Sequence, residues 1–274
     1  KVDERIWLLN DYGQQELLTP DLSTDEDFEI GGTTQTQTQL EAIVAEISTA
    51  TTQMKAVLPE KPWLPPLDTE IVSPLLECQW DSKRNMQAPF AFMDLPSKQS
   101  KQVFNFDITE LKHTAVYGSS GFGKSTALQT LVMNLARLNT PEQVQFNLFD
   151  FGTNGLLPLV KLPHTTDIVR IDQVEKLQKF IKRVRDEITQ RKNMFTRLGV
   201  ATLKQYEELT AKQLPVIITI MDGYDSVKDN ALEDSINAMV DQLLREGSGL
   251  GLYLIMTALR TSSFKMSMSA NIPS

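Results

Sequence analysis

A glycine-rich stretch in the middle of this 274-residue sequence constrains its fold more than any other feature. Residues 118–126 match the pattern G-x-x-x-x-G-K-[ST], between an apolar run at 114–117 and apolar residues at helical spacing as far as Leu138. A strand, a glycine-rich turn and a helix in this order are typical of a phosphate-binding loop. The loop consists of Gly118, Ser119, Ser120, Gly121, Phe122, Gly123, Lys124, Ser125 and Thr126. We therefore predict a nucleotide site at this position.

The residue types of the loop predict which part of a nucleotide it binds. Glycines allow the backbone to wrap closely, so that its N–H groups point at the β-phosphate, and the positive end of the following helix adds to this attraction. Lys124 is expected to bridge the β- and γ-phosphates, and the hydroxyl of Ser125 is expected to bind Mg²⁺. The expected cofactors are therefore ATP and Mg²⁺.

A second strand supplies the acid that such a site requires. The apolar run from Val216 to Met221 ends at Asp222, about a hundred residues after the loop. An apolar core strand that ends at a turn acid is common by itself, but its pairing with a phosphate loop favours a functional interpretation. Asp222 is therefore predicted to hold Mg²⁺ through water and to take part in catalysis.

The residue after this acid decides how well the site can hydrolyse ATP. Many ATPases of this general class place Glu there to polarise the attacking water, whereas this sequence has Gly223. Loss of a general base typically costs about 10²–10⁴ in rate. Asp225, Glu233 and Asp241 are nearby acids that could substitute, and Asp225 is the one we place in the catalytic set. We expect the chain to bind ATP, with hydrolysis that is slow or degenerate.

Strands and helices alternate through the rest of the sequence. Strand-like runs at 144–149, 168–171, 216–221 and 252–256 are separated by helical patterns at 174–195 and 236–245. This alternation predicts an α/β fold, a P-loop NTPase with a mainly parallel sheet like that of RecA-type ATPases, flanked by helices. An N-terminal extension precedes it, with an amphipathic helix at about 40–56 and a proline-rich linker.

Composition excludes several classes of function. The sequence has 27 Lys and Arg against 35 Asp and Glu, a net charge of −8, which argues against a protein that coats nucleic-acid phosphates. Its longest apolar stretches fall short of the roughly 18 residues of a membrane span. One cysteine and two histidines make a transition-metal cluster improbable.

Motifs beyond the loop resemble those of FtsK/SpoIIIE-type ATPases. They are the strand ending at Asp222, residues 249–252 leading into 256–260, the ending at 270–274, and the helix 187–192 that continues into the turn 198–200. Within this family the sequence resembles the type VII secretion ATPases of Gram-positive bacteria, the EssC/YukB group, and residues 118–126 are similar to their second ATPase module. The segments 10–14 and 21–23 resemble the tail of the module that precedes it.

This resemblance implies an organisation and a set of partners. It assigns residues 1–30 to the tail of a preceding ATPase module, 31–87 to a helix and proline-rich linker, and 88–274 to an FtsK/SpoIIIE-type ATPase domain. It further implies neighbouring modules of the same chain, other subunits of a hexamer, and secreted WXG-type proteins as partners, in a system linked to virulence. The parent protein would be anchored at the cytoplasmic face of the bacterial cell membrane through regions outside this sequence.

The resemblance also bears on two individual residues. Arg191 matches the position of an arginine that in some members reaches a neighbouring subunit's nucleotide, although an exposed helical arginine in a charged run is an equal alternative. Leu259 stands where the family often has a Gln that senses the γ-phosphate, and a leucine side chain cannot bind phosphate. Together with Gly223, this departure favours a degenerate motor.

Two other functions remain open at this point. One is a non-catalytic module in which nucleotide binding supports assembly or regulates its neighbours, which Gly223 and Leu259 favour. The other is a DNA translocase of the same fold, which the net charge of −8 opposes.

Overall fold

The computed structural model describes residues 7–10, 12–17, 38–58, 64–73, 77–152 and 154–272. They belong to two compact units, residues 1–61 and 62–274. Most of the predicted module tail at 1–30, and the polar run at 31–37, lie outside the described residues. The predicted division at residues 30 and 87 concerns the origin of these segments and stays a prediction.

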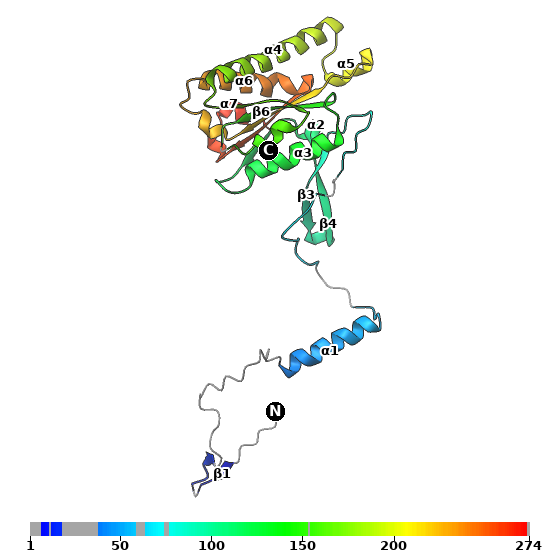
Figure 1. The fold of residues 1–274 in the computed structure, drawn as a ribbon, viewed down its shortest axis with the longest axis vertical. Helices are drawn as coiled ribbons and strands as arrows, with labels where there is room; N and C mark the ends of the chain where they lie inside the picture. Colours follow the sequence, from blue (N-terminus) through cyan, green and yellow to red (C-terminus); the bar gives the residue numbers. More distant parts are fainter. Residues whose placement is uncertain are drawn as a thin grey trace. The chain divides into compact units, whose positions relative to one another are not determined.

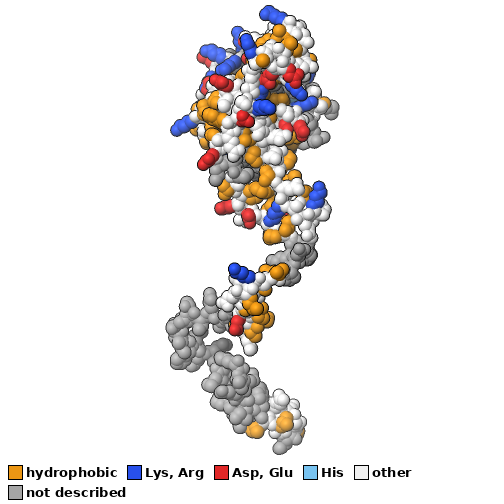
Figure 2. Space-filling view, turned by 90° about the vertical axis from the view of Figure 1, so that its right-hand side faces the viewer, with side chains coloured by type: hydrophobic (Ala, Val, Ile, Leu, Met, Phe, Trp, Pro, Cys, Tyr) orange, Lys and Arg blue, Asp and Glu red, His pale blue; other side chains and the backbone are white. Residues whose placement is uncertain are grey.

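The described residues of the first unit form a short hairpin and one helix. Strand β1 (Trp7–Leu9) pairs antiparallel with β2 (Gln15–Leu17), and α1 (Gln39–Gln53) lies within the predicted helical region. A capping box between Thr38 and Glu41 fixes the start of α1. Its apolar residues are exposed, as the orange side chains on this helix in Figure 2 illustrate, and they are Leu40, Ile43, Val44 and Ile47.

The second unit is built on a five-stranded parallel sheet. Its strands lie in the spatial order β5 (Thr114–Tyr117), β9 (Leu252–Ala258), β8 (Val216–Asp222), β6 (Val144–Asp150) and β7 (Thr165–Arg170). The pairing is parallel throughout. The predicted α/β fold with a parallel sheet is therefore confirmed.

Helices cover both faces of this sheet. In Figure 1, α4 (Val174–Leu198) and α6 (Glu233–Gln242) lie on one side of it and α3 (Lys124–Leu138) lies on the other. Shorter helices complete the unit: α2 (Ile108–Leu111), α5 (Leu203–Thr210) and α7 (Met266–Ser269). Single turns of 3₁₀-helix occupy 96–98, 157–161, 224–227, 248–250 and 261–263, and a π-helical turn occupies 243–247.

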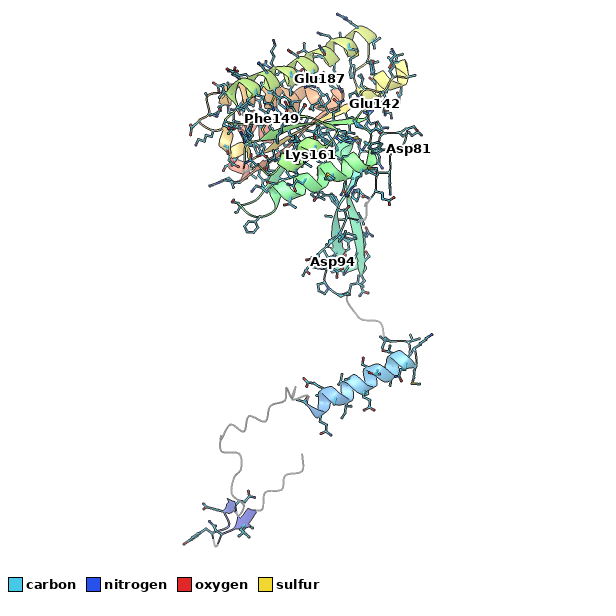
Figure 3. The ribbon with its side chains drawn as sticks, in the orientation of Figure 1. Asp81, Asp94, Glu142, Phe149, Lys161 and Glu187 are labelled. Atoms are coloured by element: carbon cyan, nitrogen blue, oxygen red, sulfur yellow. The ribbon has the colours of Figure 1, made fainter. Side chains whose placement is uncertain are left out.

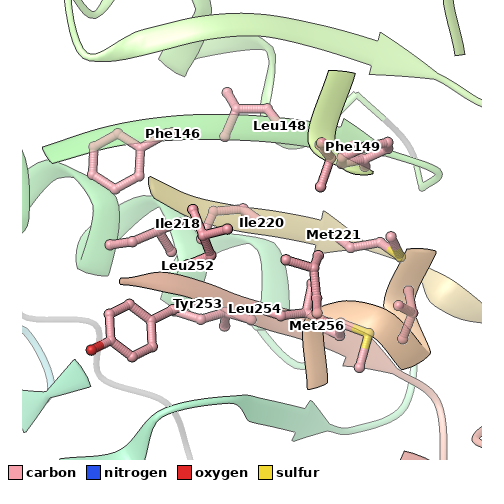
Figure 4. Packing of buried hydrophobic residues seen from close by; sticks show 14 of the residues in the cluster. Phe146, Leu148, Phe149, Ile218, Ile220, Met221, Leu252, Tyr253, Leu254 and Met256 are labelled. Atoms are coloured by element: carbon pink, nitrogen blue, oxygen red, sulfur yellow. The ribbon is translucent and has the colours of Figure 1, made fainter. Parts of the chain in front are cut away.

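The central strands form the core because helices cover them on both sides. Residues of β6, β8 and β9 are almost all buried, and Leu148, Ile220 and Leu254 are each 0% exposed. Figure 4 shows these side chains packed together along neighbouring strands. The near-continuous apolar runs in the sequence therefore mark the middle of the sheet.

A second sheet, which the sequence patterns did not predict, precedes the parallel one. Strand β3 (Gln87–Leu95) pairs antiparallel with β4 (Ser100–Asp107), and β3 packs beside α3. Figure 3 places Asp94 toward the tip of this hairpin. Aromatic and apolar residues occur on both of its faces, so the strict alternation that signals a half-buried strand is missing.

Polar side chains attach the segment before β3 to the core. Asn139, which is 0% exposed, accepts the N–H of Asn85 at 2.8 Å and donates to the carbonyl of Asn85 at 2.7 Å. The indole N–H of Trp80 donates to the carbonyl of Ala136 at 3.0 Å. These bonds satisfy the end of α3 and fix the chain that leads into the hairpin.

Among the residues that the structure describes, no helix is both long and apolar enough to cross a membrane.

Removal of a central core side chain tests this packing. Leu148→Ala, in the middle of β6, is expected to lower the free energy of unfolding by about 2–5 kcal/mol, because it leaves a cavity between packed layers. The matched control is Leu209→Ala on α5, where the leucine is 61% exposed. This change should alter the free energy of unfolding by less than about 0.5 kcal/mol. Urea unfolding followed by circular dichroism measures both, and equal effects would contradict this placement of the core.

Candidate nucleotide-binding site

The parallel sheet brings the predicted site residues to one edge. Carboxyl ends of parallel strands meet at the same edge, which is where open α/β sheets bind ligands. The phosphate loop follows β5, Thr257 lies near the end of β9, Asp222 ends β8 and Asp150 ends β6. The loop and Asp222, a hundred residues apart in the sequence, are thus neighbours in the fold.

The loop has the backbone conformation that phosphate binding requires. Gly121 and Gly123 have φ of +82° and +76°, a region that residues with a side chain rarely adopt. Helix α3 begins directly after Gly123, and no side chain of the described residues caps its first turn. The N–H groups of that turn therefore face the loop without an internal acceptor, and with the helix dipole they provide an anion site.

Lys124 is directed at the loop itself. Its Nζ donates to the carbonyl oxygens of Gly118 at 2.7 Å and Ser119 at 2.9 Å. These carbonyl oxygens accept hydrogen bonds from the ammonium group, as phosphate oxygens would. The side chain is therefore held within the loop, where it can exchange carbonyl for phosphate oxygens.

Asp222 joins the loop to two other strands through hydrogen bonds. Its Oδ2 accepts from the hydroxyl of Ser125 at 2.5 Å, and its Oδ1 accepts from the hydroxyl of Thr257. The Thr257 oxygen in turn accepts the N–H of Gly223 at 2.9 Å. Both residues predicted to bind the metal, Ser125 and Asp222, are in direct contact.

Thr257 is a site residue that the sequence interpretation missed. It is 0% exposed and lies on β9 between the loop-bearing strand and the strand of Asp222. A threonine in an apolar strand normally indicates only β-propensity, and the strand's place in the sheet is what gives it this role. The polar residue near the end of a central apolar strand was the available signal.

Asp150 is the second missed residue. It is the register partner of Asp222 on the adjacent strand β6, and it is 3% exposed. Burial raises the pKa of its carboxyl group, the N–H of Leu156 lowers it, the nearby Asp222 carboxylate raises it, and the N–H groups of Gly152 and Asn154 lower it. Oδ2 accepts the Leu156 N–H at 2.9 Å, whereas Oδ1 has no partner of good geometry among the described residues.

The backbone explains why position 223 is glycine. Gly223 has φ of +78°, and a Cβ there would lie 3.0 Å from the nitrogen of Gly152 and 3.1 Å from its Cα. The chain after β6 thus occupies the space that a side chain would need. A side chain in this position would therefore start in close contact with backbone and at a strained φ.

Two of the three acids offered as substitutes for that glutamate accept hydrogen bonds from neighbouring residues. Asp225 accepts the N–H of Leu259 at 2.7 Å through one oxygen and the hydroxyl of Ser263 through the other. It therefore anchors the chain that follows β9. Glu233 accepts the N–H of Asp229 at 2.8 Å, and Asp241 lies near the far end of α6. The catalytic role of Asp225 stays a prediction, and its hydrogen bonds favour a positioning role.

The arginine-finger role of Arg191 does not fit this structure. Its side chain is 2% exposed, and its guanidinium donates to Glu187, which Figure 3 labels on α4, and to the carbonyls of Leu250 and Pro215, at 2.7, 2.9 and 2.8 Å. Both carbonyls precede strands β9 and β8, so Arg191 lies at the amino edge of the sheet, opposite the phosphate loop. The exposed-arginine alternative is also wrong, because Arg191 is buried and joins α4 to the sheet.

The residues at the carboxyl edge fit a nucleotide-bound Mg²⁺. The ion prefers oxygen ligands and usually binds through one or two carboxylates together with substrate phosphates. Ser125 and Asp222 provide such oxygens, and the unpartnered Oδ1 of Asp150 lies beside them. The described part of the chain holds no group of three or more acidic, histidine or cysteine side chains that could bind a metal ion by itself.

Comparisons with known proteins agree with this geometry. The model of the FtsK/SpoIIIE family matches residues 74–269. The type VII secretion system protein EssC of Staphylococcus aureus (strain MRSA252) is 33% identical over 276 residues, and the ESX secretion system protein YukB of Bacillus subtilis (strain 168) is 36% identical over 236. The matches cover 98% and 86% of this chain but only 18% and 15% of those proteins.

A solved structure shows the same fold. EssC (ATPases 2 and 3) from Geobacillus thermodenitrificans superposes with a TM-score of 0.69 at 35% identity. The match covers 76% of this chain and 39% of that one. The predicted resemblance to EssC/YukB-type ATPases is therefore confirmed.

Substitution at position 223 tests the conflict between backbone and side chain. Gly223→Ala is expected to lower the free energy of unfolding by about 1–3 kcal/mol. Alanine is strained in the left-handed region, and its Cβ would make a close contact with the backbone of Gly152. The control Gly249→Ala, whose Cβ would meet only the Ala201 carbonyl at 3.5 Å, should change it by no more than about 1 kcal/mol. Gly223→Glu should not accelerate ATP hydrolysis, and a faster variant would refute this account.

Replacement of Arg191 by lysine separates a structural from a catalytic role. Arg191→Lys is expected to cost about 3 kcal/mol of unfolding free energy, since one ammonium cannot satisfy two buried carbonyls and a carboxylate. The same change at the exposed Arg183 on α4 should cost less than about 0.5 kcal/mol. Unchanged stability with reduced turnover in an assembled complex would instead restore the finger role.

Proposed function

The chain belongs to the FtsK/SpoIIIE family, and on that basis we propose that it is an ATP-binding module of a type VII secretion ATPase, with slow hydrolysis. The observation that carries this proposal is the phosphate loop placed against Asp222, with Ser125 and Asp222 in direct hydrogen bond. Similarity to secretion proteins named EssC and YukB supports the cellular role.

Each part of the site has a chemical task in this proposal. The N–H groups of 118–126 and the amino end of α3 bind the β-phosphate, and Lys124 neutralises charge on the β- and γ-phosphates. A bound Mg²⁺ would further neutralise the phosphate oxygens. Ser125 and Asp222 orient this ion, and Thr257 holds the Asp222 carboxylate in place.

Slow hydrolysis follows from what the site lacks at one position. A water molecule must be oriented and deprotonated to attack the γ-phosphate, and a glutamate after Asp222 normally does this. Here the residue after Asp222 is glycine, a Cβ there would lie only 3.0 Å from the Gly152 nitrogen, and both oxygens of Asp225 accept internal hydrogen bonds. The site can therefore bind ATP but lacks an efficient general base for its hydrolysis.

The same observations favour a second candidate, a module that binds ATP without turning it over and thereby supports assembly. Leu259, at 44% exposure, offers only its backbone N–H, which is bonded to Asp225, and has no polar group for a γ-phosphate. Turnover by this module in a larger assembly, abolished by Lys124→Ala, would exclude this candidate.

The wider organisation is part of the proposal. Residues 88–274 would form the ATPase module, 31–87 its linker and 1–30 the end of a preceding module. The chain spans 18% of the length of the EssC protein that it matches, so other modules and subunits are the expected neighbours, and WXG-type secreted proteins the expected cargo. The module would work at the cytoplasmic face of the cell membrane. Nucleic acid is not an expected partner, given the net charge of −8.

Loss of the loop lysine tests nucleotide binding directly. Lys124→Ala is expected to weaken binding of ATP with Mg²⁺ by about ten- to a hundredfold, the effect of one hydrogen bond to a charged group. Isothermal titration calorimetry on the purified chain measures this, and Lys179→Ala on the exposed side of α4 is the matched control. Equal affinity of Lys124→Ala and the unmodified chain would refute the assignment.

A further inference from the structure

A buried carboxylate with an oxygen that lacks a good hydrogen bond stands beside the proposed metal site. Asp150 is 3% exposed, and its Oδ1 has no partner of good geometry among the described residues. The backbone N–H groups of Gly152 and Asn154 lower the pKa of this carboxyl group but make no well-aligned hydrogen bond to Oδ1. A buried polar atom without a well-aligned partner costs free energy, and a ligand beside it would recover that cost. A carboxylate oxygen specifically calls for a proton donor or a cation.

The surroundings of Asp150 indicate which of the two it is. Asp150 and Asp222 are register partners on neighbouring strands, so two carboxylates stand side by side at the carboxyl edge of the sheet. A Cβ added to Gly152 would lie 3.8 Å from Asp150 Oδ1 and 3.6 Å from Asp222 Oδ2. The two oxygens therefore face one common space, which is open because residue 152 has no side chain. Two carboxylates that face a shared space favour a cation there over a proton donor.

Ser125 adds a third oxygen to this group. Its hydroxyl lies 2.5 Å from Asp222 Oδ2. A Cβ on Gly155 would lie 2.9 Å from Ser125 Oγ and 3.3 Å from Asp222 Oδ2. Glycine at 152 and at 155 thus keeps side chains away from both sides of Asp222. The oxygens of three separate elements, α3, β8 and β6, are gathered where the phosphate loop ends.

We propose that Asp150 is a second acidic residue of the magnesium site and, together with Asp222, holds water molecules of the nucleotide-bound Mg²⁺. This inference rests on the proposed function, since the phosphates and Ser125 supply the remaining oxygens. It assigns the end of β6 to metal binding, in addition to the phosphate loop and β8. Magnesium characteristically retains several waters, and two flanking carboxylates are well suited to accept their hydrogen bonds.

The test measures how strongly Mg²⁺ enhances nucleotide binding. The affinity of the full chain for a fluorescent ATP analogue is determined once in excess EDTA and once with Mg²⁺. Asp150→Asn keeps an oxygen that can accept the Leu156 N–H but removes the charge. It is expected to reduce the Mg²⁺ enhancement about tenfold while the affinity in EDTA stays within about twofold of the unmodified chain.

A second variant tests the shared space without removal of a polar group. Gly152→Ala introduces only ordinary contacts, and its methyl group would stand between the two carboxylates. It should also reduce the Mg²⁺ enhancement, and it carries the test if Asp150→Asn does not fold. The matched control is Asp172→Asn, an exposed acid that follows the neighbouring strand β7, and it should leave the enhancement unchanged.

Binding of Mn²⁺ provides an independent readout. Mn²⁺ accepts the same oxygen ligands, and electron paramagnetic resonance reports the free ion directly. With ADP present, Asp150→Asn should bind Mn²⁺ about tenfold more weakly than the unmodified chain does.

The possible outcomes separate this inference from the proposed function. If both Asp150→Asn and Gly152→Ala retain full Mg²⁺ enhancement, Asp150 is not part of the metal site, although nucleotide binding stands. Equal losses with and without metal would show that Asp150 acts only on the fold of the loop, which also overturns the inference. An unmodified chain that binds no nucleotide would overturn the proposed function, and the inference with it.

Discussion

The hydrogen bonds of Asp222 are the interaction on which the site depends. One carboxylate oxygen accepts from Ser125 at the start of α3, and the other accepts from Thr257 on β9. Three elements that are distant in the sequence are thereby fixed relative to one another within a few ångströms. Because the carboxylate is 3% exposed, these bonds act in an environment where water competes little for them. Together with the pairing of β5 and β9 and the N–H of Gly118, which donates to the Ala258 carbonyl, this buried group positions the phosphate loop relative to the sheet.

The same edge of the sheet shows how backbone geometry limits chemistry. The chain after β6 packs closely against Gly223, so that a Cβ there would lie within 3.0–3.2 Å of backbone atoms of Phe151 and Gly152 and would be strained at the positive φ. A glutamate at position 223 would therefore require the neighbouring backbone to move as well. At the opposite edge, Arg191 satisfies two carbonyls that precede strands β8 and β9. An arginine in a position associated with catalysis thus stabilises the fold instead.

Local patterns in the sequence predicted the parallel sheet and the phosphate loop, because each depends on neighbouring residues. The runs 216–221 and 252–256 are apolar apart from Thr219, and both proved to be central strands. Asp150 and Thr257 could not be identified in the same way, since their importance depends on which strands become neighbours. Burial of Arg191 was equally hidden, because a helix with many charged residues suggests exposure. The β3–β4 hairpin was missed because apolar residues on both faces remove the alternating pattern.

Lys124 gives the nucleotide-free loop a stable conformation of its own. Since its ammonium group is already bonded to the carbonyls of Gly118 and Ser119, the loop loses few contacts when a nucleotide leaves. Any arriving phosphate must first displace these internal acceptors, so part of the intrinsic affinity is spent on that exchange. Phosphate binding at this loop is therefore an exchange of one set of acceptors for another at the same ammonium group.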